Sequence, residues 1–157
     1  MSIYTASLAA VVTTAEQDIF ELTASASSRV KVRRAWVTQY SDAGDAQAEH
    51  LSILMLRGST ASGSGGSSVT PRNLEPWGIA ADSAVEANNT VVASTASAQL
   101  LIADFFDIAD GWYYNPPEDE RIHLEASQRF AIRMSAPSSS ITINAGLIFE
   151  EVGKLPS

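Results

Sequence analysis

The dominant pattern along the chain is an alternation of apolar and polar residues with a period of two, typical of β-strands that bury one face. The alternation is clearest in residues 18–23, 29–33 and 130–134, and residues 141–150 form a long stretch that is β-branched at its start. In the first stretch Phe20 and Leu22 share a face, as a half-buried strand requires. In the second, Val30 and Val32 face one side and three cations face the other. Each of these stretches is therefore predicted to be a strand.

The stretch that begins at residue 29 carries an irregularity after its third cation. Continuing the same register would place Arg34 inward beside Val32, where an unpaired charge is costly. Either the strand bulges there, or Arg34 is buried and paired. Residues 35–40 that follow are β-prone throughout, so the strand is predicted to continue.

Further segments complete an all-β pattern. Residues 50–57 form a short apolar run that suits a strand buried on both faces. Other strands are predicted at residues 90–94, 99–108 and 112–114, and alanine-rich residues 80–87 predict one short helix. The total is about eight strands with at most one short helix. We therefore predict an antiparallel β-sandwich of jelly-roll type, because a parallel α/β sheet would need helices between its strands.

The chain length and the loop composition bear on domain organisation. A chain of 157 residues suits one domain, so we expect residues 1–157 to form a single β-sandwich. Residues 41–45 are a turn by composition, and residues 58–68 are a Gly/Ser-rich segment that predicts a flexible loop. We expect residues 1–14 to form an extended N-terminal arm. This arm and the Gly/Ser loop are candidates for ordering on a partner.

Composition excludes several classes of function. The formal net charge of −8 opposes binding to nucleic acid phosphates and favours solubility. The absence of cysteine removes disulfides, thiol nucleophiles and cysteine-bound zinc. No apolar stretch approaches the ~20 residues needed to cross a bilayer, and the start lacks a basic signal region. We expect a protein made in the cytoplasm that binds neither nucleic acid nor membrane.

Catalytic residues of the serine hydrolase type are not indicated. Such an enzyme needs a nucleophile, a base and an orienting acid. The only histidines are His50 and His123, which lie in strand-like sequence and are predicted to be histidines at strand edges. No G-x-S-x-G elbow occurs either.

The acidic clusters do not predict a catalytic or metal site. The turn with Asp42, Asp45 and Glu49 has hard oxygen ligands but lacks EF-hand spacing, so a solvated turn is the preferred interpretation. The run of carboxylates at residues 118–120 places neighbours on opposite faces of a strand, which is unsuited to a catalytic pair. We therefore expect no catalytic residues, no metal, no cofactor and no enzymatic activity.

A basic row is the first feature that suggests binding. Arg29, Lys31 and Arg33 share one face of a predicted strand in an otherwise acidic protein. The row is either a solvated outer face, or a patch that meets an acidic partner or acidic neighbours such as Glu150 and Glu151.

A set of aromatic residues is the second such feature. It comprises Trp77, Trp112, Tyr113 and Tyr114. Core packing is the default for each of them, but three consecutive aromatics on a strand must place at least one ring on the opposite face. Exposed aromatic rings are typical interface anchors, and they could also stack on sugars.

Short segments resemble a known group of proteins. They are residues 41–45, 57–58, 117–122, 141–145 and 149–153. Together they resemble the small β-rich virion proteins of tailed bacteriophages, in particular the head decoration or cement proteins. That resemblance implies a jelly-roll subunit, trimers seated on the capsid at local three-fold positions, and no enzymatic activity.

Two hypotheses about function follow. The first is a homotrimeric decoration protein that binds the major capsid protein on the outside of a virion and stabilises the shell. The second is a carbohydrate- or receptor-binding module of a phage fibre or spike, with a glycan as the ligand.

Overall fold

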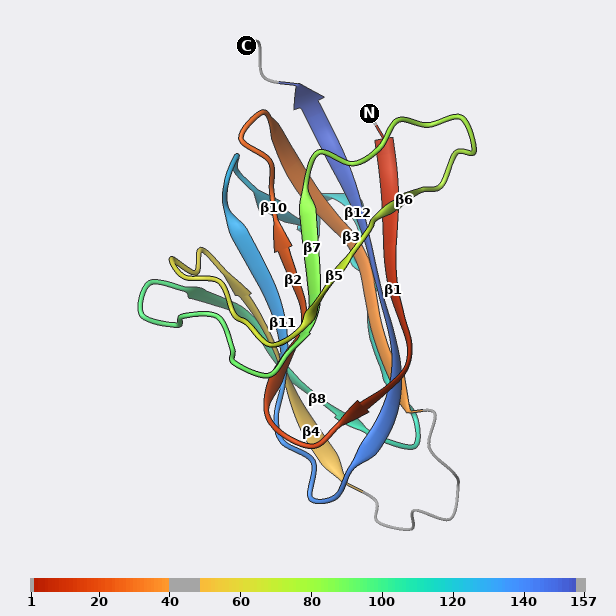
Figure 1. Cartoon of the computed structure of the whole chain (residues 1–157), viewed down its shortest axis with the longest axis vertical. Coiled ribbons are helices and arrows are strands. Elements are labelled where there is room, and N and C mark those ends of the chain that lie inside the picture. Colours follow the sequence, from red (N-terminus) through yellow and green to blue (C-terminus); the bar gives the residue numbers. More distant parts are fainter. Residues whose placement is uncertain (1, 40–48, 155–157) are drawn as a thin grey trace.

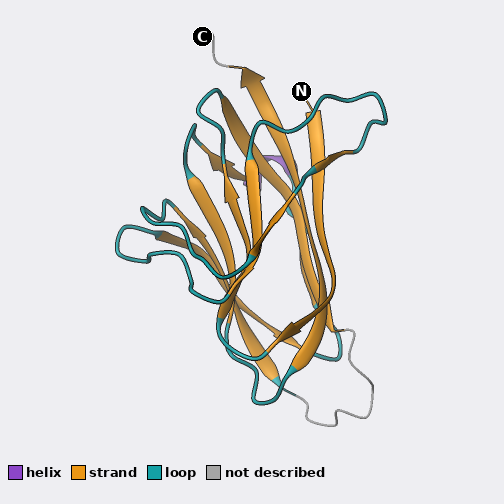
Figure 2. Cartoon of the chain, in the orientation of Figure 1, coloured by secondary structure: helices purple, strands orange, loops and turns teal. Residues whose placement is uncertain are grey.

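The computed structural model describes residues 2–39 and 49–154, which form twelve β-strands and one short 3-10 turn (Figures 1 and 2). The strands are β1 (Ser2–Thr13), β2 (Gln17–Thr23), β3 (Ser28–Gln39), β4 (His50–Arg57), β5 (Ser67–Val69), β6 (Arg72–Asn73), β7 (Ala84–Asn89), β8 (Gln99–Asp107), β9 (Trp112–Tyr114), β10 (Ile122–Leu124), β11 (Arg129–Met134) and β12 (Ile141–Lys154). The 3-10 turn, η1, covers Glu118–Glu120. The predicted turn at residues 41–45 lies outside the described residues.

The strands form two antiparallel sheets that pack face to face as a sandwich (Figure 1). Sheet A has the order β10-β3-β12-β1-β6, with β9 also paired to β3, and sheet B has the order β5-β7-β2-β11-β4-β8. Strands β1 and β3 lie in sheet A, and β2 and β4 lie in sheet B. Near the end of the chain, β11 lies between β2 and β4, and β12 lies between β1 and β3. This is the strand order of a jelly roll, so the predicted fold is confirmed.

The described residues contain more strands than the eight predicted. One strand of the roll is divided into β9 and β10, both of which pair with β3. The break between them contains Pro116 and Pro117, which cannot donate to a sheet ladder. The other additional strands are β1, described below, and β5 to β7, which lie between β4 and β8 in the sequence and extend one edge of each sheet, because β7 joins β2 and β6 joins β1. The strand predicted at residues 90–94 is wrong, since this segment forms only an isolated bridge between Val91 and Ser64.

The short helix predicted at residues 80–87 is wrong. The strand β7 begins at Ala84, and its buried residues Val85, Ala87 and Asn89 alternate with more exposed ones. The helix propensity of alanine is weak and is overridden by tertiary contacts, and here the edge of β2 offers backbone partners to residues 84–89.

The extended N-terminal arm predicted at residues 1–14 is also wrong for its described part. Residues 2–13 form β1, which lies inside sheet A between β12 and β6. Tyr4 and Ala6 are buried in the core, and the ring of Tyr4 stacks on that of Phe149 with centroids 5.6 Å apart. Burial of these apolar side chains, together with the paired backbone, makes the segment part of the fold.

A bulge in β3 resolves the irregularity at Arg34. The pairing of β3 with β12 skips one residue, since Phe149 faces Val32 while Ile148 faces Arg34. Val30 and Val32 are buried before this point, and Ala35 and Val37 are buried after it. The extra residue shifts the alternation by one, so Arg33 and Arg34 both stay outside the core.

Candidate functional site

The three consecutive aromatics of β9 divide between the two faces of sheet A. Trp112 and Tyr114 are only 5% and 8% exposed and pack in the core, whereas Tyr113 is 66% exposed. The interface role predicted for Trp112 and Tyr114 is therefore wrong. Their positions, two residues apart on one strand, give both of them the inward direction. Tyr113 keeps the outward direction.

The hydroxyl of Tyr114 closes the gap between β9 and β10. It accepts a hydrogen bond from the amide of Ile122 at 3.3 Å and donates to the carbonyl of Glu120 at 3.5 Å. Burial is the largest cause that raises the pKa of Tyr114 above its usual value of 10.0, and the Ile122 amide and Arg121 partly oppose this rise. Tyr114 is thus a structural residue of the core.

This raised pKa predicts a loss of stability in alkali. The folded chain holds the Tyr114 proton more tightly than the unfolded chain does. The resulting stabilisation is complete below pH 10.0 and is lost as the pH rises through the higher pKa of the folded state. We expect Tyr114→Phe to lose stability less steeply above pH 10.0 than the wild type in urea unfolding at a series of pH values. Identical slopes would contradict this assignment.

The predicted basic row lies on the outer face of β3, but it is largely neutralised within the chain. Arg29 forms an ion pair with Glu125 at 2.7 Å, and Arg33 forms one with Glu150, also at 2.7 Å. Lys31 faces His123 on β10 and Glu150 on β12 as a cross-strand neighbour. The predicted pairing of the row with an acidic neighbour is therefore observed between Arg33 and Glu150.

An open hollow lies on the same face, beyond the bulge. It has a volume of about 640 Å³ and is lined by Arg34, Trp36, Thr38, Tyr113 and Asn115. We call it the aromatic pocket. Trp36 and Tyr113 are direct cross-strand partners, so their side chains are close neighbours on the sheet surface.

A glycine on the next strand supports the position of Trp36. A Cβ atom placed on Gly146 would lie 1.9, 2.3 and 2.4 Å from three atoms of the indole ring. Such short distances mean that the ring occupies the space a side chain would take, and their similarity shows that the ring covers Gly146 with its face. The missing side chain therefore lets Trp36 lie across β12.

The aromatic pocket contains residues that the sequence pattern did not single out as a site. Trp36 was interpreted only as part of a β-prone stretch. Its outward direction depends on the bulge, which reverses the alternation between Val32 and Ala35. The alternation of residues 29–33 alone would have placed it inward. That Trp36 lies opposite Tyr113 follows only from the pairing of β3 with β9.

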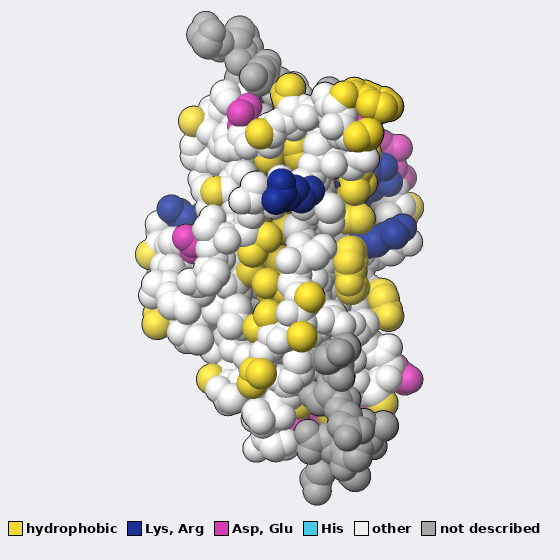
Figure 3. Space-filling view, turned by 45° about the vertical axis from the view of Figure 1, so that its right-hand side comes forward, with side chains coloured by type: hydrophobic (Ala, Val, Ile, Leu, Met, Phe, Trp, Pro, Cys, Tyr) yellow, Lys and Arg dark blue, Asp and Glu magenta, His cyan; other side chains and the backbone are white. Residues whose placement is uncertain are grey.

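A second exposed feature is the loop between β6 and β7, which projects at the same end of the sandwich as the start of β1 (Figure 1). Three large apolar side chains are exposed on it, Leu74 by 54%, Trp77 by 83% and Ile79 by 62%. The amide of Leu74 donates to the carbonyl of Ile3, which ties the loop to β1. Figure 3, which brings this side of the molecule forward, shows hydrophobic side chains along the middle of the face with basic side chains beside them.

Basic residues concentrate on sheet A. Six of the ten Lys and Arg residues lie on its outer face or rim, namely Arg29, Lys31, Arg33, Arg34, Arg72 and Arg121. A smaller hollow of about 250 Å³ connects the aromatic pocket to the loop, since Arg34 and Asn115 line both hollows and Leu74 lines the smaller one. The exposed aromatic, apolar and basic side chains thus form one continuous surface.

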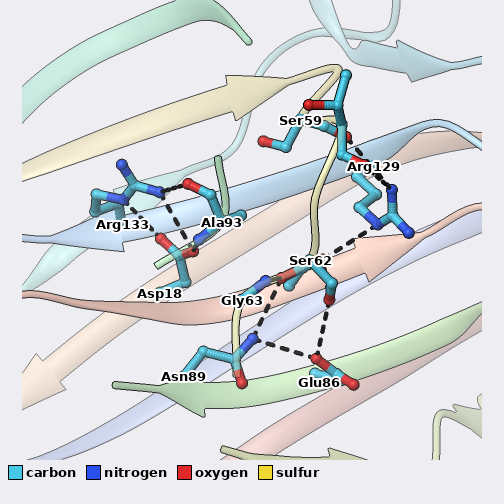
Figure 4. Close-up of polar contacts among 11 residues, drawn as sticks. Asp18, Ser59, Ser62, Gly63, Glu86, Asn89, Ala93, Arg129 and Arg133 are labelled. Carbon is cyan, nitrogen blue, oxygen red and sulfur yellow. Dashed lines mark hydrogen bonds and ion pairs between the residues drawn. The ribbon is translucent and has the colours of Figure 1, made fainter. Parts of the chain in front are cut away.

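Sheet B buries charged groups beneath two loops. Asp18 of β2 is fully buried and forms an ion pair with Arg133 of β11 at 2.7 Å (Figure 4). The backbone of Ala93 completes the set, because its amide donates to Asp18 at 2.6 Å and its carbonyl accepts from Arg133 at 2.8 Å. The pair therefore fixes the connection between β7 and β8 to the sheet.

The Gly/Ser segment at residues 58–68 is irregular up to β5, as predicted, but it is tied to sheet B. The hydroxyl of Ser62 and the amide of Gly63 both donate to the buried carboxylate of Glu21 at 2.8 Å. Asn89 donates to the same carboxylate at 3.2 Å, and Arg129 approaches it to 3.5 Å. The flexible loop predicted here is therefore hydrogen-bonded to sheet B within the single chain, and its last two residues belong to β5.

The described residues contain neither a group of side chains placed to bind a metal ion nor a helix suited to span a membrane. His50 lies at the start of β4, 62% exposed, with its Nε2 3.6 Å from a carboxylate oxygen of Asp107. In residues 2–39 and 49–154, no group of three or more acidic or histidine side chains is placed to bind a metal ion. No helix in that part of the chain has the length and apolar character to span a bilayer.

The comparisons with known proteins give no family for this chain. No protein-family model matches it, and no curated protein or solved structure matches it either. The surface geometry of sheet A and its neighbouring loop is accordingly the basis for the functional argument.

Proposed function

We propose that this protein is a structural component of a tailed-phage virion that binds the outside of the capsid and stabilises the shell, acting as a trimer. The observation that carries the proposal is the β6–β7 loop, which exposes Leu74, Trp77 and Ile79 together. Exposed large apolar side chains give a free subunit no stability. Tryptophan is also among the residues that most often supply binding energy in protein interfaces.

The charge around this loop supports the same proposal. Arg72 precedes the loop, and Arg34 lines the hollow beside Leu74. An apolar anchor with basic neighbours fits an acidic protein surface, and the basic groups would orient the encounter between the two proteins. The jelly-roll sandwich and the segments that resemble decoration proteins agree with this partner.

A trimer explains how small contacts could stabilise a capsid. Each subunit would present one loop, so a trimer would bind neighbouring capsid subunits at three points, and the second and third contacts would form at high effective concentration. Because binding occurs only to the assembled shell, it shifts the equilibrium towards assembly.

The test is co-sedimentation of the purified protein with capsids of the virus that encodes it. We expect the wild type to be trimeric in light scattering and to sediment with the capsids. We expect Trp77→Ala to bind about tenfold more weakly or worse. Its unfolding midpoint should not change, because Trp77 is 83% exposed.

Phe105→Ala is the matched control, since Phe105 is an aromatic residue of β8 that is 62% exposed in the other sheet. This variant should bind like the wild type. A monomer that ignores capsids would contradict the proposed function. Equal capsid binding by the Trp77 and Phe105 variants would show that the β6–β7 loop does not contact the capsid.

A further inference from the structure

We propose that the aromatic pocket of sheet A is a binding site for an acidic sugar, a saccharide unit of the uronic acid class that carries one carboxylate. The inference goes beyond the proposed function and does not depend on it. The pocket is the hollow lined by Arg34, Trp36, Thr38, Tyr113 and Asn115.

The aromatic side chains provide the apolar part of the site. Trp36 lies across Gly146 with one ring face, which leaves its other face directed away from the sheet. Tyr113 is its cross-strand partner and is 66% exposed. Two neighbouring rings on an open sheet surface form a platform for the C–H face of a sugar ring, as aromatic side chains combine an apolar body with a polar end.

Arg34 provides the charge that the ligand must match. Its guanidinium lies at the rim of the pocket, and its Nε donates to the side-chain oxygen of Asn115 at 3.3 Å. Within the described residues it has no ion pair with a carboxylate, unlike Arg29 and Arg33 on the same strand. The remaining N–H groups of Arg34 can bind a carboxylate with two parallel hydrogen bonds.

Thr38 and Asn115 provide groups for hydroxyl recognition. The contact between Asn115 and Arg34 uses the oxygen of the amide, so the amide NH₂ is left to donate to a ligand oxygen. The hydroxyl of Thr38 donates to the carbonyl of Asn144 at 3.4 Å, and its oxygen can still accept a hydrogen bond.

The number of available charges favours one acidic sugar over a polyanion. A nucleic acid strand or a long acidic peptide needs a series of cations along its path. Two of the three cations on β3 before the bulge are compensated, because Glu125 pairs with Arg29 and Glu150 pairs with Arg33, and Lys31 lies opposite Glu150 in the sheet. One available guanidinium beside two rings matches a ligand with one carboxylate and one apolar ring face. The volume of about 640 Å³ lies within the usual range for small-molecule sites.

The probe for the test is trigalacturonic acid, one unit of which would occupy the pocket with its single carboxylate, and the neutral galactose trisaccharide is its counterpart. Binding is followed by nuclear magnetic resonance, using the indole N–H signal of Trp36 and the amides of β3 and β9. We expect the acidic trisaccharide to bind with a dissociation constant of about 1 mM or tighter, and the neutral one at least about tenfold more weakly.

Three variants separate the contributions. Arg34→Gln should weaken binding of the acidic sugar at least tenfold while leaving binding of the neutral sugar unchanged. Gly146→Ala should weaken binding of both sugars, because the added methyl group displaces the Trp36 ring without touching the ligand. Arg29→Gln is the matched control, since it removes an arginine of the same strand outside the pocket and should bind the acidic sugar like the wild type.

Several results would overturn the inference. Absence of Trp36 shifts at saturating trigalacturonic acid would do so, as would equal losses in the Arg34 and Arg29 variants, which would show attraction to charge alone. Weaker capsid co-sedimentation of Arg34→Gln without any sugar binding would assign the pocket to a protein interface instead. Failure of the wild type to bind capsids would leave the sugar result unaffected.

Discussion

Replacing Asp18 with alanine should lower the free energy of unfolding by about 3–5 kcal/mol, because it breaks a buried ion pair. The side chain of Asp18 is 0% exposed and that of Arg133 is 6% exposed. Removal of the carboxylate leaves the Arg133 charge buried without its partner. It also removes the acceptor of the Ala93 amide. Urea unfolding followed by fluorescence measures the loss.

Two further variants identify the cause of this loss. Arg29→Gln breaks an ion pair of the same 2.7 Å length whose partners are 59% and 70% exposed, and it should cost less than about 1 kcal/mol. The double variant Asp18→Leu with Arg133→Leu should recover part of the stability lost in Asp18→Ala, because it leaves no buried charge unpaired. Equal losses for the buried and the exposed pair would contradict the importance of burial.

Phe149→Ala should destabilise the fold by about 3–5 kcal/mol through the cavity it creates between the sheets. Phe149 is fully buried at the centre of β12 and stacks on Tyr4 of the neighbouring strand β1. Because β12 lies between β1 and β3 in sheet A, a cavity here weakens contacts on both sides. The unfolding midpoint in urea should fall with little change in slope.

The control for this prediction has the same chemistry at an exposed position. Phe105 of β8 is 62% exposed, and Phe105→Ala should change the free energy of unfolding by no more than about 0.5 kcal/mol. A comparable loss in both variants would mean that β8 packs more tightly than its exposure indicates.

The local alternation of residues was enough to predict much of the fold. Val30 and Val32 of β3, and Phe130 and Ile132 of β11, are buried as their period of two requires. The large number of such stretches, with almost no helical pattern, predicted an antiparallel sandwich of the jelly-roll type. This worked because a half-buried strand shows its environment in its own sequence.

Burial imposed by distant segments could not be predicted in this way. The strand β2 was expected to be half-buried, but every residue from Gln17 to Leu22 is buried. Its polar residues Asp18 and Glu21 hold the loops that carry Ala93 and Gly63 over the outside of sheet B. The partners lie more than 40 residues away in sequence, so the local sequence pattern could not predict these contacts.

Local residue patterns were sufficient to predict an all-β sandwich, a basic row on one outer face, and an outward direction for one ring of the β9 aromatics. Which side chains meet on that face depends on how the strands pair. The bulge at Arg33 and Arg34 directs Trp36 outward, and Gly146 of β12 makes room for it beside Tyr113. The physical reason is that alternation describes one strand, whereas a surface site depends on the register between strands, which one extra residue is enough to change.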